Sequence, residues 1–70
     1  NDGSFGEKTE MILTVKQSQA KDAPSENAQN LDIFHEGTKL EILDSIDDFY
    51  KTKNDNKEVI WVSKADFEII

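Results

Sequence analysis

The sequence predicts an all-β fold: a small barrel of five to six short strands, with one helical turn near the C-terminus. Short runs rich in β-branched and aromatic residues recur at close spacing, and clusters of turn residues separate them. After Gly37, residues 39–42 alternate between charged and apolar side chains, which is the period-two pattern of a strand with one buried face. Gly37 itself marks a chain reversal, because glycine adopts a positive φ at little steric cost.

Strand and turn signals divide most of the chain into short elements. The predicted strands cover residues 11–15, 31–34, 39–46, 49–53, 58–62 and 67–70, and a stretch near 18–21 is a candidate for one more. Ser63 is expected to cap one helical turn over residues 63–66. Residues 16–30 are polar and predict a long first loop with a function or an ordered shape of its own. Two of the three glycines fall in residues 1–10, so we expect a flexible lead-in over 1–10 and a single domain over 11–70.

Composition and charge argue against several classes of protein. The chain has 70 residues, no cysteine and a formal net charge of −7, and all eight of its basic residues are lysines. An acidic chain without arginine is a poor match to nucleic acid or to an anionic membrane surface. No apolar run approaches the roughly 18 residues of a membrane-spanning helix, so we expect no direct membrane insertion. Because the chain begins with Asn1 and not with Met, we expect it to be part of a longer protein.

Few residues could carry chemistry. His35 is the only histidine, and a lone histidine in a turn is more often structural than a general base or a ligand. No nucleophile motif is present. Asp44, Asp47 and Asp48 suggest calcium, but apolar residues occupy positions where an EF-hand loop needs oxygen ligands. We therefore expect a non-enzymatic domain without a metal or a cofactor.

Three aromatic residues and one proline are the candidate ligand-binding residues. Phe49, Tyr50 and Trp61 lie on predicted strands, and Pro24 lies in the long first loop. Each ring either packs in the core or at an edge of the sheet, or belongs to an exposed patch that binds a partner. A groove for polyproline segments is not expected, because the first loop contains no aromatic residue.

Four short segments share a pattern with one known family. Residues 34–43, Phe-His-Glu-Gly-Thr-Lys-Leu-Glu-Ile-Leu, are the most specific of them, and Pro24-Ser25, residues 48–51 and residues 60–62 are the others. Together they resemble the bacterial SH3-like (SH3b) domains over about residues 11–70, which implies an SH3-like barrel. Phe49 stands where that family has Trp, and Ile60 stands where it has Gly. We therefore expect local repacking or a β-bulge at Ile60.

The longer string at residues 34–44 is similar to the C-terminal SH3-like domain of a family of Bacteroidetes tetratricopeptide proteins, which are encoded with the Bat aerotolerance proteins. In that family the domain follows helical repeats and transmembrane segments. The resemblance implies a place in the cell envelope, on the periplasmic side of a membrane-anchored parent protein.

These observations together predict a non-catalytic interaction module. The expected partner is a protein or peptide segment of an envelope assembly, bound by the first loop and by a face around Phe49, Tyr50 and Trp61. Two alternatives stay open, namely a module that binds cell-wall peptide (peptidoglycan) or targets another protein to it, and a passive spacer that orients neighbouring domains. The sequence predicts no particular oligomeric state.

Overall fold

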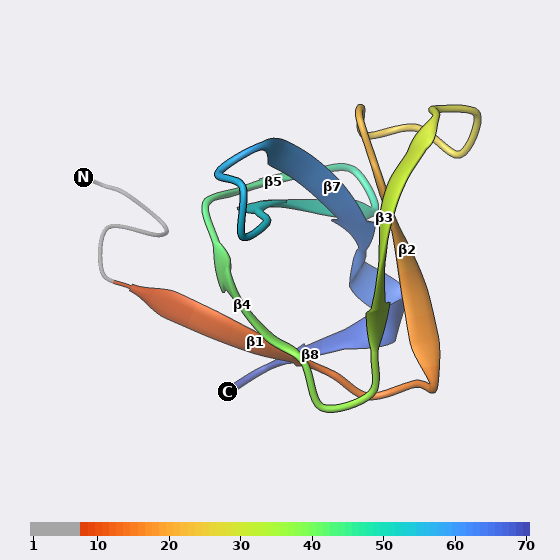
Figure 1. Cartoon of the computed structure of the whole chain (residues 1–70). Helices are drawn as coiled ribbons and strands as arrows, with labels where there is room; N and C mark the ends of the chain where they lie inside the picture. Colours follow the sequence, from red (N-terminus) through yellow and green to blue (C-terminus); the bar gives the residue numbers. More distant parts are fainter. Residues whose placement is uncertain (1–7) are drawn as a thin grey trace.

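The structure, a computed structural model, describes residues 8–70. These residues form eight strands and one short 3-10 helix, so the predicted all-β class and the helical turn near the C-terminus are confirmed (Figure 1). The elements are β1 (Thr9–Leu13), β2 (Gln17–Lys21), β3 (Asn30–His35), β4 (Lys39–Ile42), β5 (Asp44–Ile46), β6 (Phe49–Lys53), β7 (Val59–Ser63), η1 (Lys64–Asp66) and β8 (Phe67–Ile69). Residues 1–7 of the predicted flexible lead-in lie outside the described residues, and β1 includes the last two residues of that segment.

Residues 8–70 contain eight strands, where the sequence predicts five to six. The run at residues 39–46 is divided at Leu43, because Leu43 and Asp44 both lie opposite Lys51. The Leu43 N–H donates to the Lys51 carbonyl over 2.8 Å, while Asp44 is the register partner of Lys51. An arrangement in which two residues of one strand lie opposite a single residue of the next strand is a β-bulge, and it bends the strand that has the extra residue. The candidate strand near residues 18–21 is confirmed as β2. Because β2 covers Gln17–Lys21 and β3 begins at Asn30, the first loop spans residues 22–29 and not the predicted 16–30.

The strands form two antiparallel sheets that are joined at this bend. One sheet has three strands in the order β4-β1-β8, and the other has five in the order β3-β2-β7-β6-β5. Since β4 belongs to the first sheet and β5 to the second, one bent stretch of chain passes from sheet to sheet. In Figure 1, β1 and β8 cross the lower part of the view, β5 and β7 lie above them, and the β2–β3 hairpin stands at the right. The result is a small, partly open barrel around one core.

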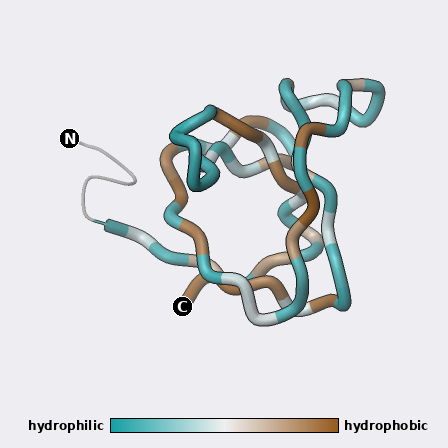
Figure 2. The backbone as a smooth tube through the Cα atoms, viewed as in Figure 1, coloured by the Kyte–Doolittle hydropathy of each residue, from teal (hydrophilic) through white to brown (hydrophobic). Residues whose placement is uncertain are grey.

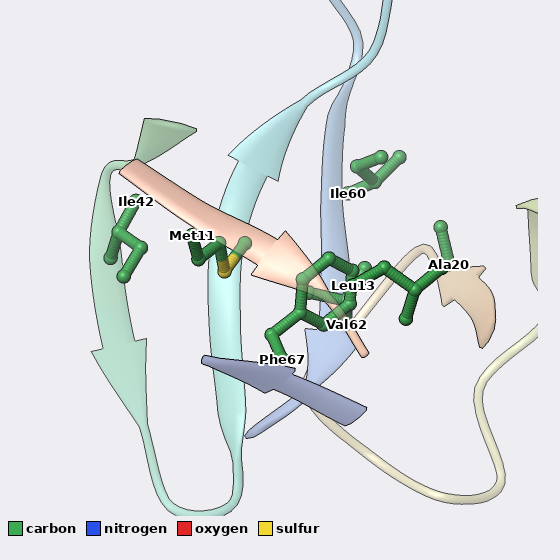
Figure 3. Close-up of a cluster of buried hydrophobic side chains, with 7 residues drawn as sticks. All are labelled: Met11, Leu13, Ala20, Ile42, Ile60, Val62 and Phe67. Carbon is green, nitrogen blue, oxygen red and sulfur yellow. The ribbon is translucent and has the colours of Figure 1, made fainter. Parts of the chain in front are cut away.

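One cluster of buried side chains fills the space between the two sheets. Strands β1 and β7 supply two members each, and these lie at alternate positions, as the period-two pattern of strands requires. Figure 2 shows how apolar and polar residues are distributed along the backbone. The members of the cluster are Met11, Leu13, Ile42 and Phe67 from the three-stranded sheet, and Ala20, Ile60 and Val62 from the five-stranded sheet (Figure 3). Ile60 is fully buried and the β6–β7 register is continuous around it, so of the two predicted alternatives, local repacking or a β-bulge, the β-bulge does not form between these strands.

Hydrogen bonds to Asp66 join the two sheets at a second point. Asp66 lies in η1, between β7 and β8. Its carboxylate accepts a hydrogen bond of 2.6 Å from the hydroxyl of Ser18 on β2, and its carbonyl accepts one of 2.9 Å from the N–H of Thr14, just after β1. Ser18 is buried, so water competes little for its hydroxyl. The short helix therefore links one strand of each sheet.

The turn between β3 and β4 depends on Gly37. Its φ of +92° lies in a region that residues with a side chain rarely adopt. The Gly37 N–H donates to the Leu13 carbonyl, and the Leu13 N–H donates to the Thr38 carbonyl, each over 2.9 Å. The turn thus reverses the chain and also attaches the start of β4 to the end of β1.

We expect Gly37→Ala to lower the free energy of unfolding by about 1–2 kcal/mol. A Cβ at this position would have no neighbour within 4 Å, so the loss would come from the positive φ and not from a clash. Urea unfolding measures it. Gly37→Asn is the matched control, since asparagine tolerates left-handed backbone better than alanine, and it should lose less; alanine and asparagine variants as stable as the wild type would refute a role for the positive φ.

We expect Ser18→Ala to lower the free energy of unfolding by about 1–3 kcal/mol, because it removes a buried hydrogen bond to a carboxylate. The control is Ser45→Ala, which removes the hydroxyl of a half-buried serine on β5. Thermal unfolding of the two variants compares them. Equal losses would mean that the Ser18–Asp66 contact contributes nothing specific to the junction of the sheets.

Candidate functional site

The five-stranded sheet carries two of the predicted binding residues on the face that points away from the core. Ile60 and Val62 of β7 belong to the core cluster, so Trp61 between them points outward. Trp61 is the register partner of Lys51, and Phe49 is two residues from Lys51 on β6, which places Phe49 on the same outward face. The two rings are therefore diagonal neighbours on adjacent strands, a spacing that large side chains can bridge.

We name this surface the outer face. Its members follow from the cross-strand pairing of four strands, β2, β7, β6 and β5. They are Lys21 on β2; Val59, Trp61 and Ser63 on β7; Phe49, Lys51 and Lys53 on β6; and Asp44 and Ile46 on β5. Apolar and lysine side chains thus lie side by side on a chain whose net charge is −7.

Trp61 lies between two lysines on the outer face. Lys21 is opposite it on β2 and Lys51 is opposite it on β6, and lysine stems can cover apolar surface while their ammonium groups stay in water. Trp61 is 9% exposed and Phe49 is 6% exposed, yet neither belongs to the core cluster. We call these two buried rings on the outside of the sheet the second apolar layer.

Two apolar side chains of the outer face stay open to solvent. Ile46, the register partner of Phe49, is 41% exposed, and Val59, near the other end of the face, is 42% exposed. Val59 is paired with Lys53. A partner could contact these side chains without displacing the buried rings.

Tyr50 lies on the opposite face of the sheet. It is the register partner of Val62 and packs, half-buried, against the core cluster. The Lys64 ammonium lies 5.4 Å from the centre of the Tyr50 ring, which is a cation–π distance. The structure therefore brings Phe49 and Trp61 together and separates Tyr50 from them by the sheet itself.

Pro24 lies in the loop of residues 22–29, which joins β2 to β3 and has hydrogen bonds of its own. The Ser25 N–H donates to the Ala23 carbonyl over 2.8 Å, and Pro24 between them is half-buried. Lys21 of the outer face donates through its Nζ to the Ala28 carbonyl over 3.5 Å. This contact connects the loop to the outer face.

The other polar residues form no cleft. No pocket opens among residues 8–70, and in that range no group of three or more His, Asp or Glu side chains is gathered as metal ligands would be. His35 is exposed, and its carbonyl accepts the hydroxyl of Thr38 over 2.6 Å. Asp47 is a turn residue with a φ of +50°. Across the described part of the chain, no helix is both long enough and apolar enough to cross a membrane.

Comparison with models of known protein families and with curated proteins finds no match. The resemblance to SH3b domains and to the tetratricopeptide proteins therefore stays a prediction. Conclusions about function depend on the geometry of the outer face.

Ile46 and Val59 were not predicted from the sequence as members of the site. A local signal for each was present. Ile46 and Phe49 flank a two-residue turn, so a hairpin pairs them across it. Val59 is two residues from Trp61, and strand alternation puts both on one face.

We expect Trp61→Ala to lower the free energy of unfolding by about 3–5 kcal/mol, because the ring is 9% exposed and its removal opens a cavity. Such a loss is a large part of the stability of a domain of this size. Urea unfolding followed by circular dichroism measures it. Val59→Ala, an exposed change on the same strand, is the control and should cost about 0.5 kcal/mol or less. A similarly small loss for Trp61→Ala would contradict a packed outer layer.

Proposed function

We propose that this chain is a non-catalytic SH3-like interaction module of a larger cell-envelope protein, and that it binds a protein segment on the outer face beside loop 22–29. The observation that supports this most is the second apolar layer, since Phe49 and Trp61 are buried outside the core cluster. Exposed Ile46 is the register partner of Phe49, and exposed Val59 is two residues from Trp61 on β7, so each lies beside one of the buried rings. Apolar side chains with polar and charged ones beside them are the usual composition of a protein interface.

The lysines give this face a preference for the charge of its partner. Lys51 and Lys53 project from β6 on the outer face, and neither has an ion-pair partner among residues 8–70. On a chain with a net charge of −7, positive charge beside exposed apolar side chains favours a segment that carries both acidic and apolar residues.

The wider setting of the proposal comes from the family resemblance. A place on the periplasmic side of a membrane-anchored tetratricopeptide protein, in the aerotolerance system of Bacteroidetes, would make the partner another segment of an envelope assembly. Cell-wall peptide is the alternative ligand for the same face. A spacer that only orients its neighbours would need no ligand at all.

Capture of proteins from a detergent-solubilised envelope fraction tests the proposal. The bait is the 70-residue chain, compared with an Ile46→Ser/Val59→Ser variant that removes exposed apolar side chains and leaves Phe49 and Trp61 in place. We expect a partner that wild type captures and the variant loses by about tenfold or more, which corresponds to roughly 1.4 kcal/mol. Ile69→Ser is the matched control, because Ile69 is 54% exposed on the other sheet, and it should capture as wild type does.

The other outcomes separate the alternatives. A partner held equally by wild type and by the Ile46→Ser/Val59→Ser variant would place the contact away from the outer face and overturn the proposed site. No captured protein, together with amide shifts on β6 and β7 during a titration with soluble peptidoglycan fragments, would favour the cell-wall ligand. No binding of either kind would favour the spacer.

A further inference from the structure

The five-stranded sheet ends in two edge strands, β3 and β5, and each has a neighbouring strand on one side only. The free N–H and C=O groups of an edge strand are a template on which another chain can add a strand. On each of these strands an aspartate accepts a hydrogen bond from the N–H of the residue after it. The same local contact thus recurs at both edges of one sheet.

At the β3 edge, Asp32 covers the N–H of Ile33. The N–H groups of successive residues in a strand point alternately to the two sides. The Glu36 N–H points toward β2, because it donates to the Lys16 carbonyl over 2.9 Å. By alternation, the Phe34 N–H also points toward β2 and the Ile33 N–H points to the open edge. There the Ile33 N–H donates to Oδ1 of Asp32 over 2.9 Å.

At the β5 edge, Asp44 covers the N–H of Ser45. The Ser45 N–H donates to Oδ1 of Asp44 over 2.7 Å. Asp44 is the register partner of Lys51, a position from which opposite charges commonly pair across strands. In the described part of the chain the two form no ion pair. The carboxylate is held at the backbone of the edge instead.

Both edges also carry exposed apolar side chains. On β3, Leu31 is 46% and Ile33 is 41% exposed, and on β5, Ile46 is 41% exposed. An edge with such side chains offers an incoming strand apolar contacts as well as hydrogen bonds. These are the features that make an unguarded edge prone to self-association.

We infer that Asp32 and Asp44 close the two edges of the five-stranded sheet against strand addition, and so keep this chain from pairing edge to edge with a second copy. A strand that added there would have to break the charge-assisted hydrogen bond between the carboxylate and the N–H in order to form a neutral backbone hydrogen bond, which is the weaker of the two. Charged side chains at sheet edges prevent such pairing in many proteins. The three-stranded sheet ends in β4 and β8, which have four and three residues, and β5 itself has three. Short edge strands are another common protection, so at the β5 edge Asp44 acts together with the shortness of the strand.

Sedimentation velocity and amide NMR on the 70-residue chain test the inference over a concentration series up to the millimolar range. Wild type should sediment as a monomer. The Asp32→Ala/Asp44→Ala variant should shift to dimers and larger species, with concentration-dependent changes and slower hydrogen exchange at the Ile33 and Ser45 amides. Circular dichroism checks that the variant is folded, and each single variant is measured too, so that one poorly folded protein does not remove the test.

The matched control is Asp48→Ala/Asp55→Ala, which removes two exposed carboxylates in turns and changes the net charge equally. It should stay monomeric. If both double variants associate to the same extent, lost charge alone explains the effect and the inference is overturned. It is also overturned if folded Asp32→Ala/Asp44→Ala stays monomeric, or if wild type itself associates through the amides of β3 or β5.

Discussion

Closure of the two sheets around one small core is the constraint on which the rest of the structure depends. The core cluster takes side chains from both sheets, and the chain has no cysteine to cross-link them. A domain of this size buries only about 60% of the surface that its unfolded chain exposes, so its free energy of unfolding is small. The bend at Leu43 and the hydrogen bonds to Asp66 hold the sheets together at two separate points. Both contacts keep the sheets at the spacing that this single core fills.

Most of the fold could be predicted from the sequence because its signals are local. Alternation over residues 39–42, the positive φ expected at Gly37 and the cap expected at Ser63 each need only a few neighbouring residues, and the structure has all three. The division of residues 39–46 into two strands could not be predicted in this way. It depends on the pairing of both Leu43 and Asp44 with Lys51. The two-residue turn that follows β5 indicates the register of the hairpin, but no residue type at 43 or 44 marks the extra residue of a β-bulge.

The candidate site was predictable only in part, for a related reason. Phe49 and Tyr50 are adjacent in a strand, so one of them had to face the core and the other the outside. The register with β7 decides which: Tyr50 lies opposite core residue Val62, and Phe49 lies on the side of Trp61. The identity of the aromatic residues was visible in the sequence, whereas their division between two faces was a property of the sheet.

The edges of the five-stranded sheet and the outer face are the surfaces that decide how another protein can bind this domain. An extended segment can bind a small β-domain by adding a strand at an edge or by docking on a face, and the first mode needs free backbone groups. Asp32 and Asp44 occupy one such group at each edge of the five-stranded sheet. Because Asp44 is held at the edge, it leaves the ammonium group of its register partner Lys51 without an ion-pair partner among the described residues of the outer face. One carboxylate thereby closes an edge and leaves a cation free for a partner, and both effects favour docking on the face over strand addition.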